Sequence, residues 1–213
     1  QLSEKVRSGG PQWLAEIGYG RVEETVINVK LGYAGWRFKR PANAPDWHAF
    51  GISSEYPHKT RSGLISREEN DVWMVMLAGL MGDYPPTDEA GFYQFARDVH
   101  PDFYAALADA EPIGKIISYR RTENRRRHFE RLERWPDRFV VVGDAVCGFN
   151  PVYGQGMSVS AIAAVGLGKQ LRQAGDRLDG VAKRFQRAYP DHLEASWLLA
   201  TSTDLEWLGQ EKG

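Results

Sequence analysis

The sequence predicts a mixed α+β / α/β fold, in which a mixed sheet with helices precedes a strand, a loop, a long helix and further C-terminal helices. Two observations support this prediction. Apolar residues alternate with a period of two at residues 27–38, and residues 72–80 are apolar on both faces, as in a strand that is covered on both sides. A wholly apolar run at 139–143 then leads into a loop and a stretch of helical periodicity over residues 157–172.

The elements expected before residue 120 follow from turn residues and from alternation. Residues 68–71 are acidic or amide side chains, which predict a hairpin turn between strands at 62–66 and 72–80. Thr87 is expected to cap a helix, and Pro101 suits the first turn of the next one. The other expected elements are a short helix at Trp13–Ile17 and strands at 27–38, 48–54 and 114–119.

After residue 138 the pattern changes. The apolar run 139–143 is typical of a short strand that is covered on both faces. The helix from Met157 is rich in small residues, and two amphipathic helices are expected at 181–189 and 192–208. No βαβ alternation is visible, so we expect this part to need a partner that completes its sheet. The domain boundary is placed between 1–120, a substrate-domain-like sheet, and 121–213.

Composition excludes several classes of protein. The net charge of −1 argues against nucleic acid or an anionic membrane as the partner. No apolar run approaches the roughly 20 residues that span a bilayer. Cys147 is the only cysteine, so an internal disulfide is excluded, and a cytoplasmic protein is expected. The five histidines are isolated in the sequence, and no metal site is predicted.

The segment 139–158 carries the chemistry. Gly143 allows close approach of the backbone, and Asp144 follows at the carboxyl end of the expected strand, where open α/β sheets bind ligands. A carboxylate there can accept hydrogen bonds from sugar-like hydroxyls. The next helix is expected to start near Gly156, so its free N–H groups and positive dipole end suit an anionic group. Each residue alone is more often a turn or cap residue, but the combined run is much rarer by accident.

This run resembles the second FAD motif of para-hydroxybenzoate-hydroxylase-like flavoprotein monooxygenases and related FAD-dependent oxidoreductases. The resemblance implies that Asp144 holds the ribityl chain and that Pro151 lies beside the isoalloxazine ring. It also implies that the backbone amides of Met157 and Ser158 face the pyrimidine end of the flavin. The full set of implied FAD-binding residues is Gly143, Asp144, Pro151, Gly154, Gln155, Gly156, Met157 and Ser158.

The resemblance implies an FAD-dependent oxidoreductase of the monooxygenase type, which uses NAD(P)H and O2 on a small organic substrate, aromatic or apolar. The family's opening strand and G-x-G-x-x-G turn, which hold the FAD pyrophosphate, have no counterpart in this sequence. We therefore expect a fragment, the carboxy-terminal half of a partial FAD/NAD(P)-binding fold, which a missing amino-terminal nucleotide-binding half completes. The alternatives are a catalytically inactive truncated module, or a docking half that binds no flavin by itself. A reductase or halogenase of the same fold is a third reading.

Three weaker features have simpler interpretations. The arginine-rich stretch at 120–134 is expected to be a solvated helix with ion pairs, and the alternative is a docking face for an acidic partner or an NAD(P)H phosphate. Cys147 is interpreted as a packing residue, because no base lies near it in sequence. Four aromatic residues are expected mainly in the core, with a substrate pocket as the alternative: Trp36, Trp73, Tyr119 and Tyr153.

Overall fold

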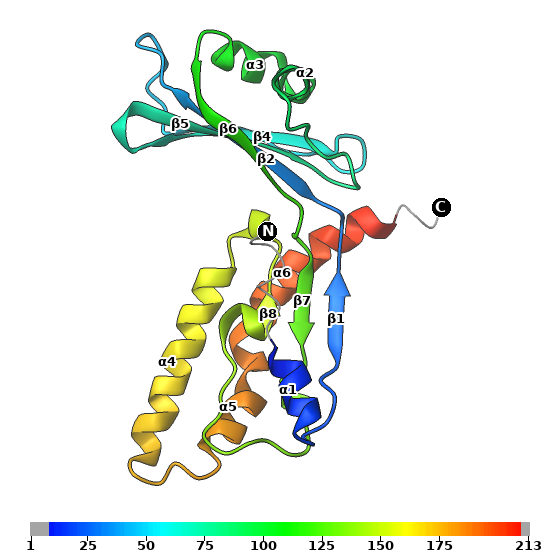
Figure 1. Ribbon diagram of the computed structural model, residues 1–213, viewed down its shortest axis with the longest axis vertical. Helices are drawn as coiled ribbons and strands as arrows, with labels where there is room; N and C mark the ends of the chain where they lie inside the picture. Colours follow the sequence, from blue (N-terminus) through cyan, green and yellow to red (C-terminus); the bar gives the residue numbers. More distant parts are fainter. Residues whose placement is uncertain (1–8, 210–213) are drawn as a thin grey trace. The chain divides into compact units, whose positions relative to one another are not determined.

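The computed structural model describes residues 9–209, which form two compact units. Among these residues, unit 1 contains 9–27 and 123–205, and unit 2 contains 28–122 and 206–209. The chain therefore passes between the units after residues 27, 122 and 205, and its course can be followed by colour in Figure 1. Each unit has its own sheet and its own buried apolar core.

Unit 2 is built on five antiparallel strands in the order β3-β4-β5-β2-β6. The predicted hairpin is confirmed, since β4 pairs with β5 from Arg61 opposite Gly79 to Glu68 opposite Val72. Asn70 in its turn has a positive φ of 60°, a conformation that Asn adopts more readily than most residues. The strands are β2 (Gly32–Lys39), β3 (Ala49–Ile52), β4 (Arg61–Glu68), β5 (Val72–Gly79) and β6 (Glu111–Tyr119).

Two helices, α2 (Glu89–Val99) and α3 (Pro101–Leu107), cover one face of this sheet, as Figure 1 shows. Alternation along β2 buries Trp36 and Phe38, and the Trp36 ring packs edge-on against Phe92 of α2 at 5.5 Å. Burial of one such side chain contributes about 1.5–3 kcal/mol. These aromatic contacts therefore fix the helices on the sheet.

The expected cap of α2 is wrong by one residue. The N-cap is Asp88 and not Thr87, and the Asp88 carboxylate accepts a hydrogen bond of 2.8 Å from the Gly91 N–H. A carboxylate at this position also interacts favourably with the positive end of the helix dipole.

The sheet of unit 1 has three antiparallel strands in the order β1-β7-β8: β1 (Glu24–Ile27), β7 (Asn124–Arg127) and β8 (Cys147–Gly148). The single strand expected over 27–38 is thus two strands, because β1 ends at Ile27 and β2 begins at Gly32. Between them Lys30 has a φ of 50°, outside the strand region, where the chain passes from unit 1 to unit 2.

The helix expected in the arginine-rich stretch is wrong, because the centre of the stretch is β7. Pairing with β1 places Arg127 opposite Glu24, and the Arg127 Nε lies 2.8 Å from the Glu24 Oε1. Arg126 is the next residue along the strand, and it pairs with Glu194 at 3.0 Å. The expected ion pairs are present, but the arginines Arg126 and Arg127 are largely buried and not solvated.

The strand expected at 139–143 is not formed in the structure. Among the described residues nothing pairs with it as a strand, although Val142 has an extended backbone (φ −139°, ψ 164°) and a side chain that is 44% exposed. Its backbone N–H groups are bonded by side chains instead: the Val141 N–H to the Gln186 Oε1 at 2.9 Å, and the Gly143 N–H to the Tyr189 Oη at 2.8 Å. A strand needs a neighbouring ladder, and this stretch lacks one in the described part of the chain.

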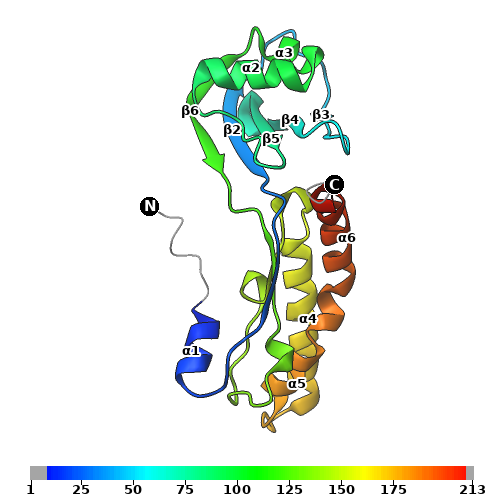
Figure 2. The same cartoon turned by 90° about the vertical axis from the view of Figure 1, so that its right-hand side faces the viewer.

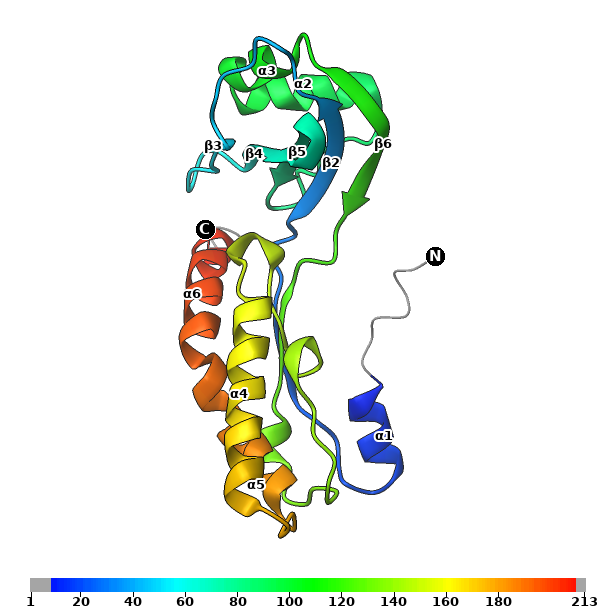
Figure 3. The same ribbon diagram turned by 90° about the vertical axis from the view of Figure 1, so that its left-hand side faces the viewer.

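The helices of unit 1 pack around a core that includes Phe185, Tyr189 and Leu193. The glycine-rich helix α4 lies beside α6, as Figures 2 and 3 show from opposite sides. At Gly166 an added Cβ would lie 2.6 Å from the His192 ring, so a larger residue there would require the ring to move. The helices are α1 (Gly10–Glu16), α4 (Gly156–Ala174), α5 (Val181–Ala188) and α6 (Pro190–Gly209), of which residues 206–209 belong to unit 2. No helix within residues 9–209 has both the length and the apolar character that crossing a membrane requires.

Candidate functional site

The centre of the candidate site is the approach of Asp144 to the start of α4. Asp144 lies in a single 3-10 turn, η3 (Gly143–Ala145), and is exposed. A Cβ added to Gly156, the first residue of α4, would lie 3.6 Å from the Asp144 Oδ1. The carboxylate and the helix start, which the sequence places twelve residues apart, therefore lie side by side.

Gly143 makes this approach possible. Its φ is +61°, a region that L side chains rarely adopt, and an added Cβ would lie 3.1 Å from the Ser160 Oγ in α4. The Ser160 hydroxyl itself donates to the Gly156 carbonyl at 2.8 Å. Glycine at residue 143 thus lets the turn that carries Asp144 rest directly on the first turn of α4.

The start of α4 offers unused hydrogen-bond donors. Its N-cap residue, Gln155, makes no side-chain cap hydrogen bond. The first N–H groups of an α-helix have no partner within the helix, so the backbone of α4 does not use those of Gly156, Met157 and Ser158. The described surroundings are open, because Met157 is 87% exposed and no atom of residues 9–209 lies within 4 Å of a Cβ added to Gly154.

Arg127 holds the backbone behind Asp144. Its guanidinium Nη1 donates to the carbonyls of Asp144 at 3.3 Å and of Ala145 at 3.0 Å, while its Nε binds Glu24. Arg127 is 8% exposed. This buried cation faces backbone oxygens and a carboxylate of the same unit, so it is a support for the turn and not a free contact for a phosphate.

The loop before α4 is held by a second group of buried polar side chains. The Asp204 carboxylate accepts from the Tyr153 Oη at 2.5 Å and from the Asn124 Nδ2 at 2.7 Å. Asn124 in turn accepts from the Asn150 N–H at 2.8 Å. Burial raises the pKa of Asp204, although these donors oppose the shift. The sequence analysis missed Asp204, Asn124 and Arg127 as parts of the site, because their partners lie far away in sequence.

The structure gives the predicted site residues different surroundings. Asp144, Pro151, Gly154, Met157 and Ser158 are exposed, and Gly143, Gln155 and Gly156 are partly buried. The side chain of Gln155 turns inward: its Nε2 donates to the Tyr153 carbonyl at 3.0 Å, and its Oε1 accepts from the Ser196 hydroxyl at 3.0 Å. Gln155 therefore ties the loop to α6, and its side chain is already engaged.

Cys147 lies in β8 and is 2% exposed. Burial raises the pKa of its thiol to about 12, and the charges of Arg126 and Arg127 do not offset this effect. A thiol in this state is protonated at neutral pH and is not a nucleophile. The surroundings of Cys147 agree with a packing residue.

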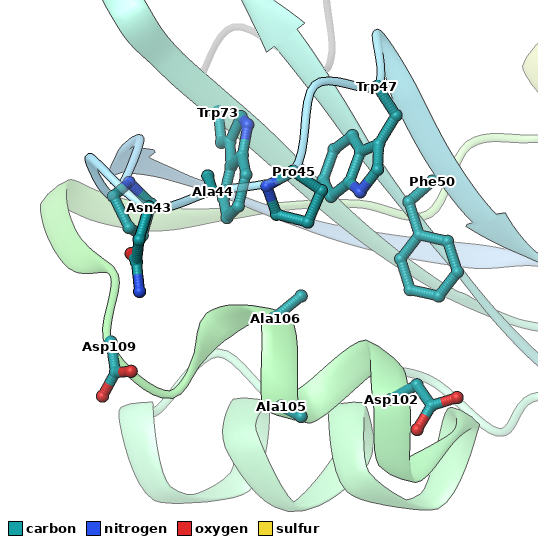
Figure 4. A pocket seen from close by; sticks show the side chains of 11 residues that line it. Asn43, Ala44, Pro45, Trp47, Phe50, Trp73, Asp102, Ala105, Ala106 and Asp109 are labelled. Carbon is teal, nitrogen blue, oxygen red and sulfur yellow. The ribbon is translucent and has the colours of Figure 1, made fainter.

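Unit 2 contains a cavity of about 430 Å³ between α3 and the loop after β2. Figure 4 shows Ala106 of α3 pointing toward this loop, with the carboxylates of Asp102 and Asp109 at the two ends of the helix. Of the four aromatic residues weighed from the sequence, only Trp73 lines it, stacked on Trp47 at 5.0 Å. The lining residues are Pro41, Asn43, Ala44, Pro45, Trp47, Phe50, Trp73, Asp102, Ala105, Ala106 and Asp109.

No family model matches this sequence. Among curated proteins, the chain is similar to Protein Rv3254 of Mycobacterium tuberculosis (strain ATCC 25618 / H37Rv), with 28% identity over 199 residues. The match covers 92% of this chain and 42% of the relative. The chain thus spans less than half the length of the curated relative that it matches.

Several solved structures share the fold at low sequence identity. A triple mutant of the flavin-dependent brominase Bmp2 matches with a TM-score of 0.66 and 16% identity, over 94% of this chain and 50% of that chain. OxyS anhydrotetracycline hydroxylase from Streptomyces rimosus matches with a TM-score of 0.56 and 16% identity, over 93% of this chain and 37% of that chain. A variant of Klebsiella pneumoniae HpxO complexed with FAD matches with a TM-score of 0.60 and 16% identity, over 85% of this chain and 46% of that chain.

At such identities the likeness establishes the fold. The chain has a mixed α+β / α/β fold that it shares with part of each of these solved structures, which confirms the fold class predicted from the sequence. It spans half or less of the length of each of these solved structures.

Proposed function

We propose that this chain is part of an FAD-dependent oxidoreductase of the monooxygenase type, and that unit 1 holds the isoalloxazine and ribityl parts of FAD. The observation that carries the proposal is the approach of Asp144 to the start of α4, with 3.6 Å between the Asp144 Oδ1 and a Cβ added to Gly156. An acceptor for hydroxyl groups and a set of free amide donors thus face the same open space. The hydrophobic side chains of Val152 and Met157, which flank the start of α4, are 55% and 87% exposed and so are not packed over it.

The residues present fit the part of FAD that they are proposed to hold. Asp144 would accept hydrogen bonds from the ribityl hydroxyls, and Pro151 would lie against the ring. The amides of Met157 and Ser158, with the positive end of the α4 dipole, would stabilise negative charge at the pyrimidine end of the flavin. When bound, FAD supplies the redox chemistry that links NAD(P)H and O2 to the organic substrate. The protein orients the cofactor and tunes its charge.

The adenine and pyrophosphate end is proposed to be held by an amino-terminal nucleotide-binding half, since no G-x-G-x-x-G run occurs in this sequence. Two structural features support such a partner. The stretch 139–142 has no strand partner among the described residues, and Val142 is 44% exposed. On α4, Ile162 and Val165 are 50% and 70% exposed. A strand from the proposed half would pair with this stretch and cover such apolar side chains.

The division of labour between the units is also a proposal. Unit 2, with its five-stranded sheet, is assigned to the small organic substrate, aromatic or apolar, and the residues after 120 are assigned to the FAD-binding part.

The second candidate function is a docking half that binds no flavin by itself. The exposed Val142 and the lack of a strand partner for 139–142 among the described residues favour this candidate, because a neighbouring half would supply both the strand and the cover.

Titration of the protein with FAD tests the proposal. We expect a shift in the visible absorbance of FAD and a change in its fluorescence on binding. Replacing Asp144 with alanine should weaken binding by about 1–3 kcal/mol, the range for a lost polar contact. The matched control is Asp176→Ala, which removes an exposed carboxylate just past the other end of α4.

Three outcomes separate the candidates. Weaker binding in Asp144→Ala and unchanged binding in Asp176→Ala support the proposed site. Equal affinity in the parent and Asp144→Ala removes Asp144 from the site. If the folded parent leaves the FAD spectrum unchanged at saturating concentration, flavin binding by this chain alone is contradicted and the docking-half candidate is favoured.

A further inference from the structure

Asp204 is an unusual buried carboxylate. It lies in α6 and is 1% exposed, and no Lys, Arg or His within residues 9–209 pairs with it. Its three hydrogen-bond partners among the same residues are all neutral donors: the Tyr153 hydroxyl, the Asn124 amide and, at 3.5 Å, the Asn150 amide. Burying a carboxylate without a cation is costly. A protein that needed only packing here would be served better by an apolar side chain.

The partners of Asp204 all lead to one loop. Tyr153 belongs to the turn η4 (Pro151–Tyr153), and Asn150 is the N-cap of that turn, where its Oδ1 accepts from the Val152 N–H at 3.3 Å. Asn124, in β7, binds Asp204 through its Nδ2 and the Asn150 N–H through its Oδ1. Both side-chain ends of Asn124 are therefore used, which fixes its orientation.

A second link from α6 reaches the same loop. Ser196 donates to the Gln155 Oε1 at 3.0 Å, and the Gln155 Nε2 donates to the Tyr153 carbonyl at 3.0 Å. Residues 150–155 are thus tied to α6 at two points two turns apart along that helix. On the outer side of the loop, Pro151 and Gly154 are exposed.

We infer that Asp204 is a positioning residue, which holds the loop 150–155 from its inner side so that the outer side presents Pro151 and the α4 amides to the flavin ring. This inference rests on the proposed function for its ligand, but the hold on the loop is a property of the protein without FAD. The three donors around Asp204 bond to its two carboxylate oxygens, which only accept hydrogen bonds when ionised. Replacing the carboxylate or the Tyr153 hydroxyl therefore loosens the loop before it disturbs the apolar core.

The test measures amide hydrogen exchange in the protein without added flavin. Tyr153→Phe removes one hydrogen bond to Asp204 and keeps the ring, and Asp204→Asn removes the charge and one acceptor. The control is Thr201→Val, which replaces a buried hydroxyl of α6 whose one hydrogen bond within residues 9–209 is to the Trp197 carbonyl of the same helix. We expect exchange at residues 150–156 to be about tenfold faster in the first two variants and unchanged in the control.

The amides of β5 in unit 2 serve as an internal reference, so that a general loss of stability is recognised by faster exchange there too. The inference is overturned if the loop exchanges at the parent rate in Tyr153→Phe, or if Thr201→Val accelerates it equally. If Asp204→Asn does not fold, Tyr153→Phe decides the question alone.

A second measurement, made with added FAD, separates this inference from the proposed function. If the parent binds FAD, the visible bands of bound FAD should differ between the parent and Tyr153→Phe and coincide between the parent and Thr201→Val. Identical bands in all three proteins would contradict a role of Asp204 in presenting the loop to the ring. If the parent binds no FAD, the proposed function fails, whereas the exchange result still decides whether Asp204 holds the loop.

Discussion

The hydroxyl of Tyr189 accepts a hydrogen bond of 2.8 Å from the backbone N–H of Gly143. Tyr189 is the C-cap residue of α5, and Gln186, one turn earlier, accepts from the Val141 N–H at 2.9 Å. Two side chains of one helix thus take the place of a neighbouring strand for alternate residues of the stretch that leads to Asp144. The position of that carboxylate depends on α5 as well as on α4.

Tyr189→Phe should therefore destabilise the protein and not only alter ligand binding. The Gly143 N–H loses its acceptor in this variant, and the expected loss is about 1 kcal/mol in the free energy of unfolding. Urea unfolding of parent and variant measures it. Tyr104→Phe is the control, because the Tyr104 hydroxyl accepts from an exposed Arg97 in unit 2 and its loss should cost less than about 0.5 kcal/mol. Equal effects in the two variants would contradict the role given to Tyr189.

Glycine substitutions should separate stability from flavin binding. In Gly156→Ala the new methyl meets the Asp144 Oδ1 at ordinary van der Waals distance, 3.6 Å, and no positive φ is strained. We expect unchanged or slightly raised stability and weaker FAD binding, because the methyl occupies the space beside Asp144. In Gly154→Ala the Cβ meets nothing within 4 Å, but the φ of +63° costs about 1–2 kcal/mol. Calorimetry and FAD titration of both variants check this; a Gly156→Ala variant with parent affinity would contradict it.

The sequence predicts best those elements whose signal is local. The hairpin β4–β5 and the long helix α4 follow from the period of their own residues and from the turn or loop beside them. The stretch 139–143 has the composition of a strand, but a ladder depends on a partner that its own residues do not encode. The centre of the arginine-rich stretch is β7 because Glu24, 103 residues before Arg127, pairs with it across the sheet.

The candidate site divides in the same way. Asp144 and Gly156 stand in one short motif, so their proximity could be expected from the sequence. The groups that hold this motif could not be expected, since Asp204 lies 80 residues from Asn124 and 51 from Tyr153. An acidic residue in an apolar stretch of α6 is the only local sign of that contact.

Cys147 should give the protein a characteristic response to alkaline pH. Burial raises the pKa of its thiol to about 12, compared with about 8.5 in an unfolded chain. Between these values the folded protein binds the proton more tightly, so this contribution to stability is fully present below about pH 8.5 and is lost as pH rises toward 12. The free energy of unfolding of the parent, relative to Cys147→Ala, should fall by up to about 1.4 kcal/mol per pH unit in this window. Thermal unfolding of both proteins at pH 8 and pH 10 measures the difference, and parallel pH curves would contradict it.

Glu24 should determine part of the response to acid. Burial alone would raise the pKa of its carboxyl, but hydrogen bonds and charge from Arg127 and Arg125 outweigh burial and lower it. A lowered folded pKa means that the contribution to stability is present above the unfolded value of about 4.3 and is lost as pH falls through the folded pKa. Glu24→Gln should thus be less stable than the parent at pH 7, and the free energies of unfolding of the two proteins should converge below pH 4.

Chemical unfolding at pH 7, 5 and 3 checks this prediction. The control is Glu16→Gln, at an exposed residue of α1, which should keep the parent's pH profile. A constant difference between parent and Glu24→Gln from pH 7 to pH 3 would show that the ion pairs at the edge of the sheet do not depend on the Glu24 charge.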